Sequence, residues 1–355
     1  GKFTTAGGVN ADRIARWNRT NWSVVGTGMN NDVNSLTVYN GLLIAGGNFN
    51  NAGGISASRI AKWNGTIWDQ LGEGMNNEVL CLGTYNGELI AGGKFTSAGG
   101  VSASRITRWN GTVWNPLFTG LNSEAYALIV FNGELIVGGK FTSAGGNAVE
   151  RIAKWNGAVW TSINPGMNDD VHALTVLNTF LIAGGKFTNA GGISTNRIAR
   201  YNGTNWTSLS SGTNDVVNAI GYFNGLMHAS GNFTMAGGID ANKVARWDIP
   251  VKLKEIAGTT PTNFKLYQNY PNPFNPVTLI KFDLPKLDNS NSNNYDVTLK
   301  VYDVMGKEVI TLINQKLNPG KYELNFDASD LTSGVYFYRL TSVDFKQTNK
   351  MIVMK

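Results

Sequence analysis

The chain has few of the residues that most catalytic and redox centres use. Its 355 residues contain one cysteine, Cys81, and two histidines, His172 and His228. A single cysteine excludes an intrachain disulfide, and a zinc or copper site normally needs three or four His, Cys or carboxylate ligands. We therefore expect no metal-dependent catalysis. We interpret Cys81 as a small buried residue and both histidines as incidental substitutions.

Long apolar runs and nucleotide-binding motifs are also missing. No segment approaches the roughly 18 apolar residues that cross a membrane as a helix, and no basic-then-apolar leader stands at the start. There is no Gly-x-Ser-x-Gly elbow and no phosphate-binding loop that opens a helix. These absences argue against a transmembrane segment and against the common hydrolase and nucleotide-binding classes.

What the sequence does contain is a repeat of fixed length. Aromatic residues recur every 46 residues without insertion or deletion. The three series are Phe3, Phe49, Phe95, Phe141, Phe187 and Phe233; Trp17, Trp63, Trp109, Trp155, Tyr201 and Trp247; and Trp22, Trp68, Trp114, Trp160 and Trp206. Such a period predicts a repeat architecture. The chain begins with Gly1 inside a repeat, so we expect a processed or truncated form.

The repeat that starts at residue 33 predicts two β-hairpins. Asn40-Gly41 and Asn64-Gly65 each join two short β-rich runs, and Asn-Gly favours the type I′ turn of a hairpin. The four expected strands, lettered A to D, cover residues 33–39, 42–45, 59–63 and 66–71. A polar, Gly-rich loop connects B to C. Four short antiparallel strands per repeat predict one blade of a β-propeller.

Strand direction places the longer loops on one face of this propeller. If the strands alternate, the B-to-C loops (such as 50–58) and the D-to-A crossings (such as 74–78) share a face, which we name the loop face. We expect any ligand site there or at the channel mouth. The candidate ligand residues at equivalent crossings are Asn30, Asp32, Asn76, Glu78, Asn122, Glu124, Asn168, Asp170 and Asn214.

These candidate residues have two interpretations. As a ring of amides and carboxylates they would bind a cation or sugar hydroxyls. Alternatively, each acid pairs with the arginine that begins strand C, and each asparagine shapes its turn. The ring is incomplete, since one repeat has Val216 at the acid position and Asp215 one residue earlier. No motif supports a cation in the channel, so we expect no cofactor.

Charge and tryptophan follow the repeat as well. The net charge of +6 is mildly basic, but basic residues recur at fixed positions instead of gathering on one face, which argues against a nucleic-acid partner. One such series begins strand C: Arg13, Arg59, Arg105, Arg151, Arg197 and Lys243. We interpret the tryptophans as packing partners across a hairpin, with stacking on sugars as the alternative.

The repeat resembles kelch repeats, in which a strand ending in Gly-Gly is followed by an aromatic residue and then a tryptophan, as in Gly46-Gly47, Trp63 and Trp68. The resemblance covers residues 1–249 and implies an all-β propeller, which we count as six blades or a truncated seven. Residues 250–262 are expected to be a linker or a closing strand. In the second case residues 251–256 supply either strand D of the last blade or the missing strand A of the first.

The composition changes near residue 250. All ten tryptophans precede it, and seven of the nine prolines lie at or after it. Roughly seven alternating short strands over residues 263–355 predict an immunoglobulin-like β-sandwich. The composition change therefore marks a boundary between two domains.

Residues 263–355 closely resemble the C-terminal sorting domain of type IX secretion substrates from Bacteroidota and their relatives. The residues that carry the resemblance are Tyr270, Pro271, Asn272, Pro273, Phe274, Asn275 and Pro276, the turn glycine Gly306, Gly334, and the terminal run from Lys350 to Lys355. The resemblance implies an N-terminal export signal and type IX secretion machinery as a partner. It also implies delivery to the outer-membrane surface or the medium of a Gram-negative bacterium.

Together these patterns predict a secreted, non-catalytic propeller that serves as a binding, adhesion or structural module for an unknown glycan or protein. Two alternatives stay open. A carbohydrate-active enzyme on a propeller scaffold would need two carboxylates, or a His–Tyr pair, converging on one spot. A homo-oligomer, as a subunit of an extracellular filament or array, would use exposed blade edges.

Overall fold

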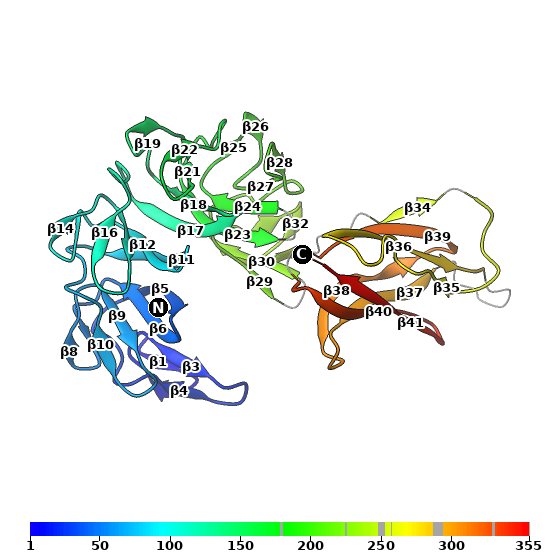
Figure 1. Ribbon diagram of the computed structural model, residues 1–355, viewed down its shortest axis with the longest axis horizontal. Coiled ribbons are helices and arrows are strands. Elements are labelled where there is room, and N and C mark those ends of the chain that lie inside the picture. The colour runs from blue at the N-terminus through cyan, green and yellow to red at the C-terminus, as the bar shows by residue number, and fades with distance from the viewer. Residues whose placement is uncertain are drawn as a thin grey trace. The chain divides into compact units, whose positions relative to one another are not determined.

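The computed structural model describes residues 1–177, 180–223, 226–247, 253–256, 258–286, 294–328 and 331–354. Within these ranges every regular element is a β-strand, so the fold is all-β (Figure 1). None of the described residues forms a helix long and apolar enough to cross a membrane. The chain divides into two compact units, the first drawn mainly from residues 1–245 and the second mainly from residues 246–355.

The first unit is a β-propeller of repeated four-stranded antiparallel sheets. In the second repeat, β5 (Val33–Tyr39), β6 (Leu42–Gly47), β9 (Ile60–Trp63) and β10 (Trp68–Gln70) lie side by side in that order. The next three sheets are β11 (Val79–Tyr85), β12 (Glu88–Gly93), β15 (Ile106–Trp109) and β16 (Trp114–Pro116); β17 (Ala125–Phe131), β18 (Glu134–Gly139), β21 (Ile152–Trp155) and β22 (Trp160–Ser162); and β23 (Val171–Leu177), β24 (Phe180–Gly185), β27 (Ile198–Tyr201) and β28 (Trp206–Ser208). The predicted four-stranded repeat is confirmed.

The described residues give smaller sheets to the first and last repeats. The first repeat has β3 (Ala15–Trp17) and β4 (Trp22–Val24), which correspond to strands C and D. The last has β29 (Val217–Phe223), β30 (Leu226–Gly231) and β33 (Val244–Trp247), which correspond to A, B and C. The count of six blades therefore stays a prediction.

The loop between strands B and C is more regular than predicted. In the second repeat it contains a small hairpin of β7 (Asn51–Ala52) and β8 (Ile55–Ser56), closed by Gly53 and Gly54 at φ 63° and 89°. Positive φ at both turn residues defines a type I′ turn, for which Gly-Gly is well suited. The same hairpin recurs as β1 (Thr5–Ala6) with β2 (Val9–Asn10), β13 (Ser97–Ala98) with β14 (Val101–Ser102), β19 (Ser143–Ala144) with β20 (Asn147–Ala148), β25 (Asn189–Ala190) with β26 (Ile193–Ser194), and β31 (Met235–Ala236) with β32 (Ile239–Asp240).

Aromatic side chains join each repeat to the one before it. Trp68 and Trp114 are 3% exposed, and their indole N–H groups donate to the backbone oxygens of Val25 at 2.9 Å and Leu71 at 3.1 Å. Five of the repeated phenylalanines are 0% exposed: Phe49, Phe95, Phe141, Phe187 and Phe233. Trp63 and Trp68 pack with ring centroids 5.3 Å apart. The tryptophans of the second to fifth repeats thus pack as predicted, whereas Trp17 and Trp22 of the first repeat contact each other but are exposed.

The inner strands line the concave side of this array. In Figure 1 the sheets of the first unit follow one another round an arc, with β5, β11, β17, β23 and β29 innermost. Neighbouring inner strands such as β5, β11 and β17 are in contact. Cys81 of β11 is buried, and burial raises the pKa of its thiol to about 12. A small buried residue at this position agrees with the prediction.

The second unit is an immunoglobulin-like sandwich of two four-stranded antiparallel sheets. The strands are β34 (Lys254–Ile256), β39 (Gly320–Asp327), β36 (Val277–Leu284) and β35 (Lys265–Leu266) in one sheet, and β38 (Glu308–Leu317), β37 (Tyr295–Tyr302), β40 (Gly334–Ser342) and β41 (Phe345–Val353) in the other. Phe282, Leu299 and Tyr338 are 0% exposed in the core they share. The predicted sandwich is confirmed.

Part of the segment predicted as a linker or a closing propeller strand belongs to this sandwich. Lys254–Ile256 forms β34 and pairs with β39, so that Lys254 lies opposite Glu323. The Lys254 Nζ atom lies 3.0 Å from Glu323 Oε1, and Leu253 packs against the sandwich core. The prediction of a closing propeller strand is therefore wrong for these residues, because the edge of β39 provides their backbone partners.

Candidate functional site

The asparagines predicted at the loop face hold the small hairpins in place. The Asn76 Oδ1 atom accepts hydrogen bonds from the backbone N–H groups of Thr96 at 2.9 Å and Ser97 at 3.0 Å, and its Nδ2 donates to Thr96 Oγ1 at 2.9 Å. The same pair of backbone bonds is accepted by Asn30, Asn122, Asn168 and Asn214. These amides therefore fix loop geometry, and ligand binding by them stays a prediction.

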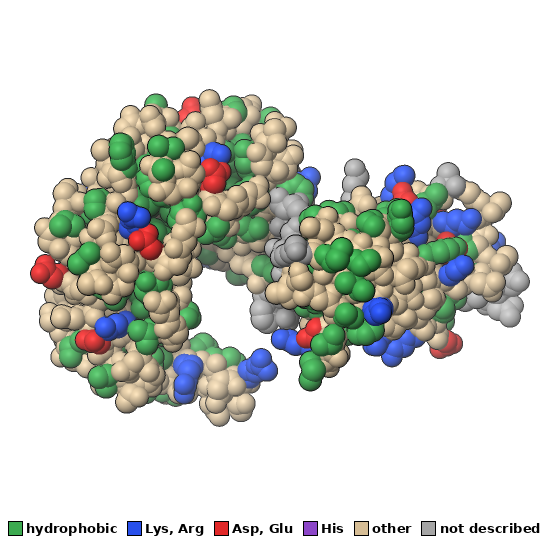
Figure 2. Space-filling model, viewed as in Figure 1, with side chains coloured by type: hydrophobic (Ala, Val, Ile, Leu, Met, Phe, Trp, Pro, Cys, Tyr) green, Lys and Arg blue, Asp and Glu red, His purple; other side chains and the backbone are tan. Residues whose placement is uncertain are grey.

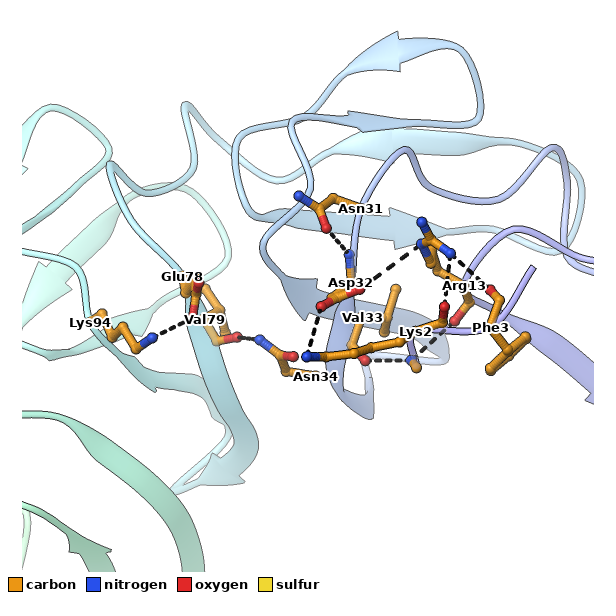
Figure 3. Close-up of polar contacts among 11 residues, drawn as sticks. Lys2, Phe3, Arg13, Asn31, Asp32, Val33, Asn34, Glu78, Val79 and Lys94 are labelled. Carbon is orange, nitrogen blue, oxygen red and sulfur yellow. Dashed lines mark hydrogen bonds and ion pairs between the residues drawn. The ribbon is translucent and has the colours of Figure 1, made fainter.

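The acids of the predicted ring pair mainly with lysines. The Glu78 carboxylate lies 2.9 Å from Lys94 Nζ (Figure 3), and the Asp170 carboxylate lies 3.8 Å from Lys186 Nζ. In both pairs the lysine follows the acid by 16 residues, directly after the Gly-Gly that ends strand B. The Glu78–Lys94 pair is partly exposed on both sides and contributes about 0–1 kcal/mol to stability, whereas Asp170 is itself buried.

Glu124 has the same surroundings in the fourth repeat. Ser123 donates a hydrogen bond to its carboxylate, and this bond lowers the pKa of Glu124. The charge of Lys140, which again follows the acid by 16 residues, lowers the pKa further. The carboxylate is therefore held in its charged form.

Asp32 differs because its own repeat has Asn48 at the lysine position. Its carboxylate lies 3.7 Å from Lys2 Nζ and 4.0 Å from Arg13 Nε, both in the preceding repeat. Figure 3 shows these cations converging on Asp32 beside the Glu78–Lys94 pair of the next repeat. Cations thus surround the acid even where the repeat pattern is broken.

In the last repeat the acid and the lysine are absent together. Val216 stands at the acid position and Asn232 at the lysine position. The two positions thus change together in this repeat, whereas Asp32 is kept where the lysine position is Asn48. The Asn232 side chain instead accepts a hydrogen bond from Asn218 Nδ2 at 3.3 Å.

The arginines that begin strand C bind backbone oxygens, and Arg13 also reaches Asp32, as the acid–arginine pairing predicts. Arg59 Nη1 donates to the Asn48 backbone oxygen at 2.7 Å, and Arg105 Nη1 donates to that of Lys94 at 3.0 Å. Both arginines have positive φ, at 68° and 66°. The expected acid–arginine pairing is therefore wrong for Glu78 and Asp170, because the B-to-C loop uses the guanidinium groups and lysines reach the acids.

Two cavities lie at equivalent places on the loop face. The larger, of about 430 Å³, is lined by Glu150, Arg151 and Asn168, and the smaller, of about 270 Å³, by Arg197 and Asn214. Each lies between the start of strand C in one repeat and the small hairpin of the next. Two of the predicted residues thus line cavities although their amides already have partners.

His172 lies among polar side chains of neighbouring repeats. Its ring stands edge-on to Tyr126, with centroids 5.2 Å apart, and its Nδ1 lies 3.3 Å from Asn218 Oδ1. Burial lowers the pKa of His172 and raises that of Tyr126 to about 12, so both rings are uncharged at pH 7. In the part of the chain that the structure describes, no three His, Cys, Asp or Glu side chains are placed to hold a metal ion.

In the second unit, the Pro-rich motif lies against the C-terminal strand. Phe274 is 2% exposed, and its backbone N–H donates to the Ile352 oxygen at 3.0 Å. The Asn272 Oδ1 atom accepts from the Ile352 N–H at 2.9 Å, and its Nδ2 donates to the Lys350 oxygen at 3.3 Å. The Pro-rich run and the terminal run, from opposite ends of the domain, are therefore joined by hydrogen bonds into one structural element.

A buried hydrogen-bond network anchors the same motif. The Tyr338 hydroxyl accepts from the Asn269 backbone N–H at 2.7 Å and donates to the Tyr267 oxygen at 2.8 Å. Thr278 Oγ1 accepts from Asn269 Nδ2 at 2.9 Å and donates to the Pro271 oxygen at 2.7 Å. Sequence analysis does not find Asn269 or Tyr338, because a buried amide and a core tyrosine look ordinary in a strand-rich segment.

The remaining motif residues lie on the surface and at turns. Tyr270 is 81% exposed. The other exposed members of the Pro-rich run are Pro271, Pro273 and Asn275, while Pro276 is half-buried. Gly306 occupies the turn between β37 and β38 with φ 77°, and Gly334 begins β40. Lys355 lies outside the described residues.

Comparison with protein families identifies both units. Residues 268–354 match the family described as a secretion system C-terminal sorting domain. Residues 181–207 match a family described as a domain of unknown function (DUF5122) beta-propeller. The search of curated proteins found no match. The resemblance to kelch repeats stays a prediction.

The chain therefore joins β-propeller repeats to a sorting domain of the type IX secretion system. That domain implies export to the cell surface or the extracellular space, as is typical of Bacteroidota. It also implies interaction with the secretion machinery.

Proposed function

We propose that the protein is a non-catalytic binding or adhesion module that works outside a Gram-negative bacterium. The observation that carries this proposal is the uniformity of the propeller. At equivalent loop positions the amides hold hairpins and the acids pair with cations, as in Asn76 and the Glu78–Lys94 pair. Equivalent surfaces arranged around an array suit the binding of an extended partner.

In this proposal the sorting domain determines where the propeller is delivered. Residues 263–355 engage the type IX machinery, and the propeller is the cargo that remains at the outer-membrane surface or is released. A carbohydrate-active enzyme would require an asymmetric pair of carboxylates at one spot. The repeated acid–lysine pairs favour a binding module over such an enzyme.

A retention assay tests the proposal. Beads coated with the full chain are incubated with immobilised polysaccharides and with fixed cells, and released reducing sugars and unsaturated products are measured in the same wells. We expect saturable retention on at least one surface without any product. Product release that disappears on heat denaturation would overturn the non-catalytic assignment. Absence of retention on every surface would overturn the binding role.

A further inference from the structure

The repeat varies at one position of its inner strands. The second residue of these strands is, in chain order, Asn34, Leu80, Tyr126, His172 and Asn218. The residue before it is always Val or Ala, and the residue after it is always Ser, Cys or Ala. Packing explains the two uniform neighbours, whereas the variation in side-chain type between them needs a separate reason.

In the second, third and fourth repeats a β-bulge lies at this position. The pairing of inner strands with their neighbours shifts register between Val33 and Ser35, between Val79 and Cys81, and between Ala125 and Ala127. The residue between each of these pairs has no partner in the ladder. Bulges of this kind re-aim a side chain and are over-represented next to active sites.

From the fourth to the last repeat, the side chains at this position contact one another. The Tyr126 and His172 rings meet edge to face, His172 Nδ1 lies 3.3 Å from Asn218 Oδ1, and Asn218 Nδ2 donates to Asn232 Oδ1 at 3.3 Å. We name Tyr126, His172, Asn218 and Asn232 the inner arc. Three of them lie in the innermost strands β17, β23 and β29, and Asn232 directly follows β30. Figure 2 shows open space on the concave side of the first unit.

The earlier repeats use the same position differently. Asn34 donates to the backbone oxygen of Val79 at 3.0 Å (Figure 3), and Leu80 offers hydrocarbon alone. The ion pair of Glu78 and Lys94 lies beside them. The inner arc instead ends in the last repeat, where the positions equivalent to Glu78 and Lys94 are the uncharged Val216 and Asn232.

The chemistry of the inner arc suits an uncharged polyhydroxyl ligand. Each amide offers donors and an acceptor, and a neutral imidazole offers one of each. The phenol adds an aromatic surface with a polar tip. The nearest cations are already balanced, since Lys186 lies 3.8 Å from Asp170 and Lys140 faces Glu124. An acidic ligand would need cations free to bind it.

We propose that the inner arc binds a neutral saccharide, with Tyr126 as the aromatic contact and His172, Asn218 and Asn232 as hydrogen-bonding groups. This inference rests on the proposed binding function and names its site and ligand class. His172 lies at the centre of the arc, since its ring touches a member on each side.

Imidazole NMR on the full chain tests the proposal, because the protein has two histidines. The variant His172→Asn assigns the signals. Neutral hexasaccharides of glucose, xylose and mannose are added one at a time, and hexagalacturonate serves as the charged comparison. We expect one neutral hexasaccharide to shift the His172 signals saturably. Failure of all three neutral sugars, or tighter binding of hexagalacturonate, would overturn the proposal.

Matched variants separate the site from the fold. His172→Ala and Asn218→Ala are expected to weaken binding at least about tenfold, which corresponds to about 1.4 kcal/mol. Leu80→Ala changes the equivalent position outside the arc and is expected to leave affinity unchanged. Should His172→Ala alter the thermal unfolding midpoint, His172→Gln replaces it. An equal loss in Leu80→Ala would contradict the site.

The retention assay keeps the two proposals apart. If beads carrying His172→Ala and Asn218→Ala are still retained like the wild type, the inner arc is not the binding site and the proposed binding function stands. If the wild-type beads are not retained at all, the proposed function itself fails.

Discussion

The propeller and the sandwich build their cores in different ways. From the second to the fifth repeat, the propeller buries the same phenylalanine and tryptophan positions between neighbouring sheets, as Phe95 and Trp114 show. The sandwich has one core with residues used once, such as Phe282 and Tyr338. This difference decides whether packing alone explains why a given residue occurs at its position. In the propeller, packing explains a residue that recurs at the equivalent position of other repeats. A residue that differs from its equivalents there needs another explanation.

The largest expected effect tests whether the two cores are separate. Phe141 and Phe282 are both 0% exposed, and replacing either with alanine should cost about 3–5 kcal/mol. Scanning calorimetry of the full chain should show that Phe141→Ala lowers only the propeller transition and Phe282→Ala only the sandwich transition. If both transitions move together in each variant, the two cores are coupled.

A second prediction concerns the buried hydrogen-bond network around Tyr338 in the sandwich. Tyr338→Phe removes the hydroxyl that links the Asn269 N–H to the Tyr267 oxygen and leaves both backbone groups without that partner. We expect a loss of about 2–4 kcal/mol in the sandwich transition. Tyr270→Phe, on an 81% exposed side chain, should change stability by less than about 0.5 kcal/mol. Equal effects of the two would refute the network.

The third prediction compares one repeat position at two degrees of burial. Trp114→Phe loses the bond to the Leu71 oxygen and should cost about 1–3 kcal/mol. Trp22, which is 41% exposed, should tolerate the same change within about 0.5 kcal/mol. Urea unfolding followed by tryptophan fluorescence measures both. A similar cost at both positions would mean that contact with the preceding repeat is unimportant.

The smallest expected effect depends on pH. The pKa of Glu124 is lowered in the folded state, first by the Ser123 hydrogen bond. Its contribution to stability is therefore present above the unfolded pKa and is lost as pH falls through the folded value. Because the group is largely solvated, Glu124→Gln should cost less than about 1 kcal/mol at pH 7 and a smaller amount at about pH 3. The free energy of unfolding of both forms measures this; an equal difference at both pH values would contradict it.

Periodicity and turn chemistry predicted much of the fold. The Asn-Gly pairs and the alternating pattern predict β5 with the bounds that the structure has, Val33–Tyr39. The paired glycines of the B-to-C loop carried the same kind of signal for the small hairpins, which sequence analysis treated as plain loops. Glycine pairs that need positive φ, such as Gly53 and Gly54, would have identified them.

Partners across space were harder to predict. The lysine that follows three of the acids by 16 residues was visible in the sequence. The positive φ of Arg59 and Arg105, which accompanies their bonds to loop carbonyls, was not. Pairing of β34 with β39, and of Phe274 with Val353, depends on which backbone edge is free after folding. No local pattern encodes that choice.

Surface localisation tests most directly whether residues 268–354 act as the sorting domain that exports the propeller. A bacterium with a working type IX system expresses the full chain and a form that ends at residue 267, each behind the same export signal. Antibody labelling of intact cells and of the medium should detect the full chain, while the shortened form stays in the periplasm. Equal detection of both forms outside the cell would contradict a sorting role for residues 268–354.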